Sequence, residues 1–193
     1  MRGVFFLFGL VTLLFNFSSC QNNVERPKDK NALSEIKIGK QIWSSNLNIK
    51  TDQSICNEDC SSTGRLYAYR EAIKLEQQYD GWELPLEEDW TELEKFIEDK
   101  NERSSDSYKS GADKLKKIKG FDQFPGYAVS SKEMIYPGEW GAYWVKDTYT
   151  TEQYGIVAYA RVLKTKGNKP NMVYKILMGV DTTNYLSVKL IKR

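Results

Sequence analysis

Residues 81–100 read GWELPLEEDWTELEKFIEDK, the stretch that says most about the fold. Its apolar residues recur at spacings of three and four: Trp90, Leu93, Phe96 and Ile97. This is the period of a helix with one buried face. Three acidic residues at 87–89 precede the pattern, and negative charge is favourable at the positive end of a helix dipole. We therefore predict a helix over residues 87–100.

The preceding stretch, GRLYAYREAIKLEQQY at 64–79, predicts a second amphipathic helix. The residues expected on its buried face are Leu66, Tyr69, Ala72, Ile73 and Tyr79. Closer to the N-terminus, EIKIGKQIWSSNL at 35–47 alternates isoleucines with charged residues and contains a Gly-Lys pair. That pattern indicates a β-hairpin. The first half of the chain therefore predicts a hairpin followed by two helices.

The second half has the composition of a β-sheet. After a polar segment and a short helical pattern at 114–118, Pro-Gly turns occur within 124–126 and 136–138, and Tyr, Val and Thr become frequent. Three further segments each predict a strand: 155–164, 171–179 and 185–193. Helices in the first half and a sheet in the second indicate an α+β domain, closed by a strand at each terminus.

The N-terminus has the pattern of an export signal. An apolar stretch of roughly 14 residues, Val4–Phe17, follows Arg2 and is shorter than the ~20 residues that a membrane-spanning helix needs. Two serines then precede Cys20, as in a lipobox. We predict a lipoprotein signal peptide over residues 1–19 and a diacylglycerol anchor on the Cys20 sulfur. The alternative is an ordinary signal that a cysteine happens to follow.

Export to an oxidising compartment permits disulfide bonds. Apart from Cys20, the chain has only Cys56 and Cys60, in the sequence CNEDC. We predict that these two cysteines form a disulfide that closes a short loop, a local clasp worth about 2 kcal/mol on the loop-entropy formula. The alternative, half of a zinc site, needs four ligands, and the chain has no histidine and no further cysteine.

Charge and composition bear on nucleic-acid binding and on the bounds of the folded domain. Without Arg2 the chain has 27 basic and 26 acidic residues, and its one basic run, at 114–120, is interrupted by apolar residues. A nucleic-acid partner is therefore not expected, because such binding needs clustered cations. Residues 20–34 have no apolar period, which predicts a flexible tether. The folded domain is then expected over residues 35–193.

Several segments resemble, in the same order, the Fibrobacter succinogenes major paralogous domain, a family of bacterial secreted and lipoprotein domains. They are IKIGKQIWSSNL, GRLYAYREA, GWELPLEEDWTEL, GAYWVKDTYT and YLSVKLI, which together span about residues 36–192. The most specific piece is the Gly-Trp-x-Leu-Pro block at 81–85. The resemblance implies a C-type lectin-like fold, in which two helices pack on a twisted, mostly antiparallel sheet and the N- and C-terminal strands are adjacent.

The chain departs from the family at two cysteine positions, where it has Gln78 and Leu190. The resemblance implies that these cysteines pair in relatives, so this chain would hold its terminal strand by packing alone. In related calcium-binding lectins a carboxylate stands where this chain has Lys169, in NKPN at 168–171. A lysine there would repel calcium, so the resemblance implies no metal site, and no cofactor is expected.

Catalysis is also not expected. Without histidine the usual serine or cysteine triads cannot form, so no catalytic residue is assigned. Two carboxylate pairs, Glu87 with Asp89 and Glu133 with Glu139, leave a glycosidase as an alternative. Carboxylates in the first turn of a helix are also expected for their interaction with the dipole alone.

Aromatic residues are the remaining candidates for ligand binding, because they offer rigid, amphipathic surface. The chain has 12 Tyr and 5 Trp. We assign Trp82, Trp90 and Trp144 to packing, since they lie within the segments that resemble the family, on expected helix or strand faces. The candidate ligand-binding residues lie near predicted turns: Trp140, Tyr149 and Tyr154.

The expected protein is a lipoprotein of the cell envelope, attached by its lipid to a membrane, with the outer membrane as the expected location. The residues after Cys20 do not indicate which face of the membrane carries the domain. The expected activity is non-catalytic binding of a glycan or of an envelope protein. The alternative is a structural or assembly role without a small ligand.

Overall fold

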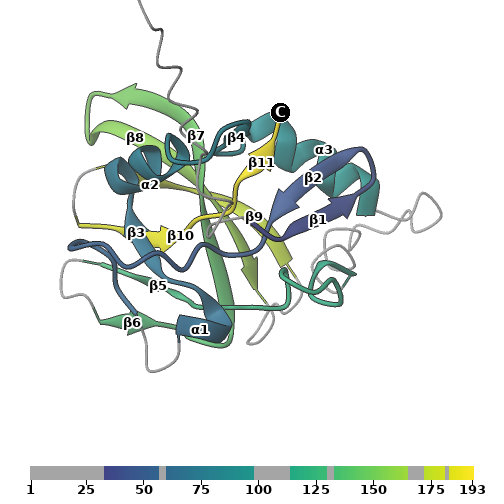
Figure 1. Cartoon of the computed structure of the whole chain (residues 1–193). Helices are drawn as coiled ribbons and strands as arrows, with labels where there is room; N and C mark the ends of the chain where they lie inside the picture. The colour runs from purple at the N-terminus through teal and green to yellow at the C-terminus, as the bar shows by residue number, and fades with distance from the viewer. Residues whose placement is uncertain (1–32, 57–59, 98–113, 130–132, 165–171, 181–182) are drawn as a thin grey trace, which may run out of the picture. The chain divides into compact units, whose positions relative to one another are not determined.

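The computed structural model describes residues 33–56, 60–97, 114–129, 133–164, 172–180 and 183–193. Residues from Leu33 to Arg193 form one compact unit. It has α-helices and two mostly antiparallel β-sheets (Figure 1), which confirms the predicted α+β class. The helices with bounds in the described residues are α1 (Cys60–Thr63), α2 (Tyr69–Glu76) and α3 (Glu87–Ile97).

The smaller sheet joins the two ends of the domain. Its four strands lie in the order β1 (Glu35–Ile38), β2 (Gln41–Ser44), β11 (Ile191–Lys192) and β4 (Trp82–Glu83). β1 and β2 form the predicted hairpin, and Gly39, with φ of 60°, allows its tight turn. β11 pairs antiparallel with β2 and with β4. The C-terminal strand therefore lies beside the second strand of the N-terminal hairpin and not beside the first.

The larger sheet is built mainly from the second half of the chain. Its strands lie in the order β6 (Met134–Ile135), β5 (Tyr127–Ala128), β10 (Tyr185–Ser187), β7 (Trp140–Thr151), β8 (Gly155–Lys164) and β9 (Met172–Gly179). A seventh strand, β3 (Leu66–Ala68), pairs with β10. The prediction of one strand over residues 185–193 was wrong in detail, because this segment forms β10 in the larger sheet and β11 in the smaller one.

Helices α2 and α3 cover opposite faces of the larger sheet. Successive side chains of a strand point to opposite faces, so Trp144 and Tyr143 of β7 belong to different cores. Trp144 packs with the buried residues of α2, namely Tyr69, Ala72 and Leu75. Tyr143 packs with those of α3, namely Trp90, Leu93 and Ile97. Both faces of β7 are therefore buried along Gly141–Val145.

Two details of the predicted helices were wrong. The helix predicted over 64–79 begins only at Tyr69, because residues 66–68 pair with β10 as a strand. Phe96 was expected on the buried face of its helix, but 62% of its surface is exposed. The ring of Phe96 lies against Gly39 at the rim of the domain. Local periodicity therefore predicted the two helices, but not the residue at which α2 begins or the exposure of Phe96.

The C-terminal strand is held by hydrogen bonds and ion pairs as well as by packing, which corrects the expectation of packing alone. Backbone N–H of Ser44 donates to the Leu190 carbonyl at 2.8 Å, and the Leu190 N–H donates to Ser44 Oγ at 2.8 Å. Arg193 donates from both terminal nitrogens to the Asp89 carboxylate, each at 2.8 Å. Leu190 itself is fully buried and Gln78 is exposed.

Among the described residues, one lysine lies entirely inside the domain. Lys189 has 0% of its surface exposed, and its Nζ donates to the carbonyls of Ser44 and Gly120. Nζ also lies 4.1 Å from the centre of the Phe121 ring and 5.6 Å from that of Tyr143. Burial lowers the pKa of Lys189 to about 7, and the charge of Asp122 opposes this shift in part. We call Lys189 with Phe121 and Tyr143 the lysine cage.

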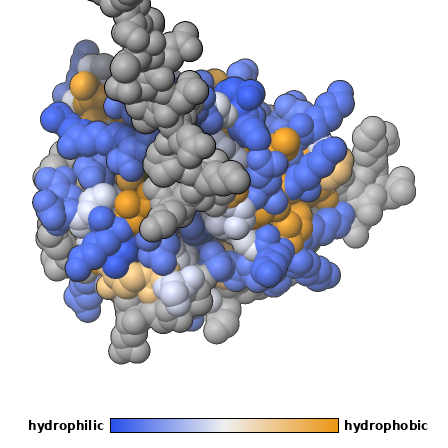
Figure 2. Space-filling view, in the orientation of Figure 1, coloured by the Kyte–Doolittle hydropathy of each residue, from blue (hydrophilic) through white to orange (hydrophobic). Residues whose placement is uncertain are grey.

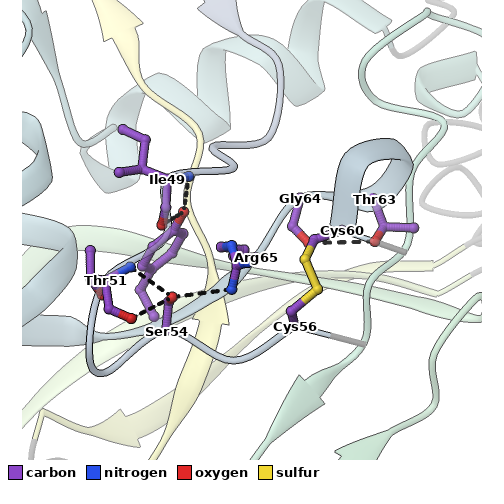
Figure 3. The surroundings of a disulfide bond; sticks show 9 residues. Ile49, Thr51, Ser54, Cys56, Cys60, Thr63, Gly64 and Arg65 are labelled. Atoms are coloured by element: carbon purple, nitrogen blue, oxygen red, sulfur yellow. Dashed lines mark hydrogen bonds between the residues drawn. A yellow bond between two sulfur atoms is a disulfide. The ribbon is translucent and has the colours of Figure 1, made fainter. Parts of the chain in front are cut away.

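The predicted pairing of Cys56 with Cys60 is confirmed. The two residues form a disulfide with a Cα–Cα distance of 5.5 Å, at the start of α1 (Figure 3). The neighbouring loop is closed by polar contacts that Figure 3 also shows: Arg65 donates to Ser54 Oγ at 3.3 Å, and Ser54 Oγ donates to the Thr51 carbonyl at 2.9 Å. The disulfide is therefore a local clasp on a loop that hydrogen bonds already hold.

Candidate functional site

Three aromatic rings gather at the end of the larger sheet where β7 begins. The rings of Tyr136 and Trp140 are stacked, with centres 4.6 Å apart and an angle of 21° between their planes. Tyr127 of β5 lies against both, with ring centres 5.9 Å from Trp140 and 6.4 Å from Tyr136. We call Tyr127, Tyr136 and Trp140 the aromatic platform. β5 and the turn before β7 bring them together from positions that are not adjacent in sequence.

The backbone of Tyr136 is held in an unfavourable conformation. Among the described residues it is the one non-glycine residue with positive φ, at 52°. Such a conformation costs on the order of 1–3 kcal/mol and persists only where the surroundings enforce it. Here the Tyr136 carbonyl accepts hydrogen bonds from the N–H groups of Glu139, at 3.2 Å, and of Trp140, at 3.1 Å. The tight turn from 136 to 140 thus places the two rings face to face.

A second turn locks the first in place. The N–H of Gly126 donates to the Trp140 carbonyl at 2.7 Å, and the N–H of Gly138 donates to the Phe124 carbonyl at 2.6 Å. Gly126 has φ of 79°, and a Cβ there would lie 2.3 Å from the Ile135 carbonyl oxygen. Only glycine fits such a close approach of two chain segments. The two Pro-Gly turns predicted from the sequence therefore interlock to support the aromatic platform.

The platform faces solvent and has a cation beside it. Tyr136 is 48% exposed, and Trp140 is partly buried. Lys164, which pairs with Trp140 in the β7–β8 register, places its Nζ 5.2 Å from the centre of the Trp140 ring. Burial raises the pKa of Tyr127, and its neighbour Tyr136 adds a smaller contribution in the same direction. The Tyr127 hydroxyl therefore stays protonated, and able to donate a hydrogen bond, to higher pH than an exposed tyrosine.

This arrangement is suited to binding and has no obvious chemistry of its own. Aromatic faces offer flat apolar area, and tyrosine hydroxyls and the lysine ammonium add polar contacts at its edge. A ligand with alternating apolar patches and hydroxyl groups, such as a sugar ring, matches that combination.

The structure brings only one of the three predicted ligand-binding residues into the platform. Trp140 opens β7, whereas Tyr149 pairs with Val157 near the other end of the strand and Tyr154 lies in the β7–β8 turn. The Tyr149 ring packs edge-on against Tyr159, with centres 4.7 Å apart. Tyr154 is 67% exposed. The predicted three residues therefore do not form one surface.

Sequence reasoning missed Tyr127 and Tyr136 as partners of Trp140. The available signal was the spacing of the two turns, since each tyrosine is within one residue of a Pro-Gly pair. What the sequence did not reveal is that these turns lie side by side. Trp82, Trp90 and Trp144 are buried, as their assignment to packing predicted.

The candidate carboxylates of a glycosidase have other contacts. Glu87 Oε1 accepts from Arg161 at 2.7 Å and from Lys175 at 3.2 Å, which ties α3 to β8 and β9. Asp89 accepts from Arg193 and also from the Leu86 N–H, at 2.7 Å, and so caps α3. Within the described residues Glu133 precedes β6 and Glu139 lies in the turn before β7.

Several predictions concern residues outside the described ranges. The signal peptide at 1–19, the anchor Cys20, all but the last two residues of the tether, and the NKPN motif at 168–171 all fall there. Within the described ranges no three or more His, Cys, Asp or Glu side chains are grouped so that they could hold a metal ion. In the same ranges no helix has the length and apolar character needed to cross a membrane.

Comparison with known proteins adds no relative: no family model, no curated protein and no solved structure matches this chain.

Proposed function

We propose that this protein is a membrane-anchored lipoprotein of the bacterial envelope whose lectin-like domain binds a glycan, without catalysis, on the aromatic platform. The lipid on Cys20 would hold the domain at a membrane, with the outer membrane as its proposed location. The resemblance to the Fibrobacter succinogenes major paralogous domain supports both the anchor and the lectin-like fold. The adjacency of the terminal strands, through β11 and the β1–β2 hairpin, is compatible with that fold.

The observation that carries the proposal is the exposed, stacked pair of Tyr136 and Trp140. A solvent-exposed tyrosine held at positive φ costs stability, and the ring of Tyr136, 48% exposed, belongs to none of the hydrophobic clusters of the described residues. Backbone strain of this kind concentrates at binding and catalytic sites. Because the strain holds the two aromatic faces together before a ligand arrives, binding would lose less entropy in ordering them.

Tryptophan fluorescence offers a direct test. Of the five tryptophans only Trp140 is more than 8% exposed, so a ligand on the platform should change the emission of this residue alone. We expect ligands found on a glycan array to shift the fluorescence of the exported chain. Replacement of Trp140 or Tyr136 by alanine should weaken binding by roughly fivefold, because aromatic contacts are worth on the order of 1 kcal/mol each.

The matched control is Tyr154→Ala, which removes a more exposed tyrosine at the other end of the β7–β8 hairpin. This variant should bind like the unchanged protein. Equal loss in Tyr154→Ala and Trp140→Ala would contradict the assignment of the platform. Absence of any glycan or protein ligand would instead support the structural or assembly role, and glycan turnover that Glu87→Gln abolishes would show a glycosidase.

A further inference from the structure

A second surface feature lies where the β1–β2 turn meets the C-terminal end of α3. Its residues are separate from those of the aromatic platform. Here a groove with a volume of about 930 Å³ is lined by residues of the hairpin and of the helix, among them Lys37, Lys40, Lys95 and Phe96. Figure 2 shows hydrophobic residues rimmed by hydrophilic ones over the part of the molecule where Figure 1 draws β1, β2 and α3. The groove therefore combines apolar and charged surface.

Among the described residues that line this groove, most of the charges are positive. Lys37, Lys40 and Lys95 are exposed, and none of them has an ion-pair partner within 4.0 Å in the described part of the chain. Glu92 is the one acidic residue among the described residues of the lining. Other lysines of the domain behave differently: Lys146 and Lys175, for example, are paired with glutamates.

Phe96 adds an aromatic ring that is exposed but held in position by a contact with Gly39. Although 62% of its surface is exposed, its ring rests on Gly39, where a Cβ would lie 2.8 Å from the ring. Gly39 also has φ of 60°, so two requirements favour glycine at this turn. The contact fixes the ring at the edge of the groove, where it projects beside the lysines.

The two ends of α3 differ in charge. Near its first turn a second groove is lined by four acidic residues, Glu87, Glu88, Glu92 and Asp147, and it reaches as far as Lys95, which the two grooves share. Lys95 and the two hairpin lysines lie at the other end of the helix. Of these two grooves in the described part of the chain, the one that holds all three lysines would attract a negatively charged surface more strongly.

We propose that this groove docks the domain on the anionic phospholipid headgroups of the membrane that carries its anchor. The three ammonium groups would contact lipid phosphates, and Phe96 would enter the interfacial layer, where aromatic rings are favoured. The inference rests on the anchoring part of the proposed function and is independent of glycan binding.

The chain enters the domain close to this surface. The described part begins at Leu33, two residues before β1, and β1 leads directly to Lys37 and Lys40. The tether predicted from the sequence between Cys20 and Leu33 would, as a flexible chain, span about 20 Å. Three lysines attract an anionic surface only weakly, but an anchored domain stays at high local concentration near it. The anchor would keep the domain near the membrane, and the groove would set the orientation of the domain on the membrane surface.

Cys20 provides a way to test the inference without biological acylation. Since Cys56 and Cys60 are bonded to each other, Cys20 is the one free thiol and can be coupled to a maleimide lipid. The exported chain, which contains the compact unit from Leu33 to Arg193, would be coupled to phosphatidylcholine vesicles with or without phosphatidylglycerol. Lysine acetylation rates would then be measured residue by residue with mass spectrometry.

We expect Lys37, Lys40 and Lys95 to be acetylated roughly fivefold more slowly on the anionic vesicles, the change expected for a lysine attracted to such a surface. Lys164, on the aromatic platform, is the internal control and should react at the same rate on both. Phe96→Ser should reduce the protection, and high salt should remove it.

Equal rates on both vesicles, or equal protection of Lys164, would overturn the inference. Protection by an added acidic protein but not by anionic vesicles would also overturn it, in favour of a protein partner. Docking by the coupled chain, without entry of labelled fatty acid into the protein in cells, would support the docking groove and contradict the proposed lipid anchor on Cys20.

Discussion

The domain places lysines over aromatic rings both in its interior and on its surface: Lys189 is the buried case, and Lys164 is a surface case, as are Lys175 and Lys192. In the lysine cage, Lys189 Nζ lies 4.1 Å from the centre of the Phe121 ring and is fully buried. At the aromatic platform, Lys164 Nζ lies 5.2 Å from the centre of the Trp140 ring, beside the exposed Tyr136. The residue types are alike, but their surroundings differ, and so do their expected roles.

In the interior the aromatic faces are already occupied. Trp90 lies between Trp43, at 4.9 Å, and Tyr143, at 5.6 Å, while Phe121 packs against Trp43 at 5.8 Å. No ring face there is open to a ligand. At the platform the stacked pair of Tyr136 and Trp140 still has surface in contact with water. The comparison indicates that burial, and not residue type, separates an aromatic group that stabilises the fold from one that can bind.

The largest expected effect is a difference in stability between the two lysines. Lys189→Ala would leave a cavity and remove the donor from two carbonyl groups, so we expect it to lower the free energy of unfolding by about 3–5 kcal/mol. Lys164→Ala, at the surface, should change it by less than about 0.5 kcal/mol. Urea unfolding of both variants measures this difference. Similar losses of unfolding free energy in the two variants would contradict the contrast between the buried and the surface lysine.

The next effect concerns pH. Burial lowers the pKa of Lys189 from 10.5 to about 7, so between these values the unfolded chain binds a proton that the folded protein does not. Stability should therefore rise as the pH increases from about 7 towards 10. Lys189→Met keeps the length of the side chain but cannot titrate, and it should not show this rise. Thermal midpoints between pH 6 and pH 9.5, read with roughly half-unit steps, compare the two proteins.

Above that range the tyrosines should reverse the trend. Burial raises the pKa of Tyr69 from 10.0 to about 12, with smaller contributions from the charges of Glu76 and Asp147. Above pH 10 the unfolded chain loses this proton while the folded protein keeps it, so stability falls.

The outcome that would contradict the Lys189 prediction lies at lower pH. A wild-type protein whose stability is constant from pH 7 to 9.5 would show that Lys189 remains charged inside the cage.

The smallest expected effect is at Tyr136. Tyr136→Ala and Tyr136→Gly both remove the ring and should weaken glycan binding equally. Only glycine adopts positive φ without strain, so the glycine variant should be about 1 kcal/mol more stable than the alanine variant. Chemical unfolding of the pair measures this difference directly. Equal stabilities would mean that the backbone of Tyr136 stores no strain, and the main support for the platform would be lost.

The sequence predicted several parts of this structure correctly. The β1–β2 hairpin and helix α3 were indicated by patterns within short segments, and they lie where expected. Trp140 was selected from the sequence as a ligand-binding candidate, and it belongs to the platform. Its partners were not selected, because Tyr127 and Tyr136 reach it only through the contact between two turns. Tyr149 and Tyr154 were grouped with Trp140 by closeness in sequence, and an extended strand separates them.

The sequence by itself determined the local features of this protein: the helical periodicity, the hairpin and the Cys56–Cys60 disulfide. Each depends on residues a few positions apart, whose geometry the chain itself limits. Tertiary structure decided that Leu66–Ala68 is a strand, that the C-terminus divides between two sheets, and that one lysine is sealed inside while another stays at the surface. These outcomes depend on contacts between distant segments, and no local pattern specifies which distant surfaces will meet.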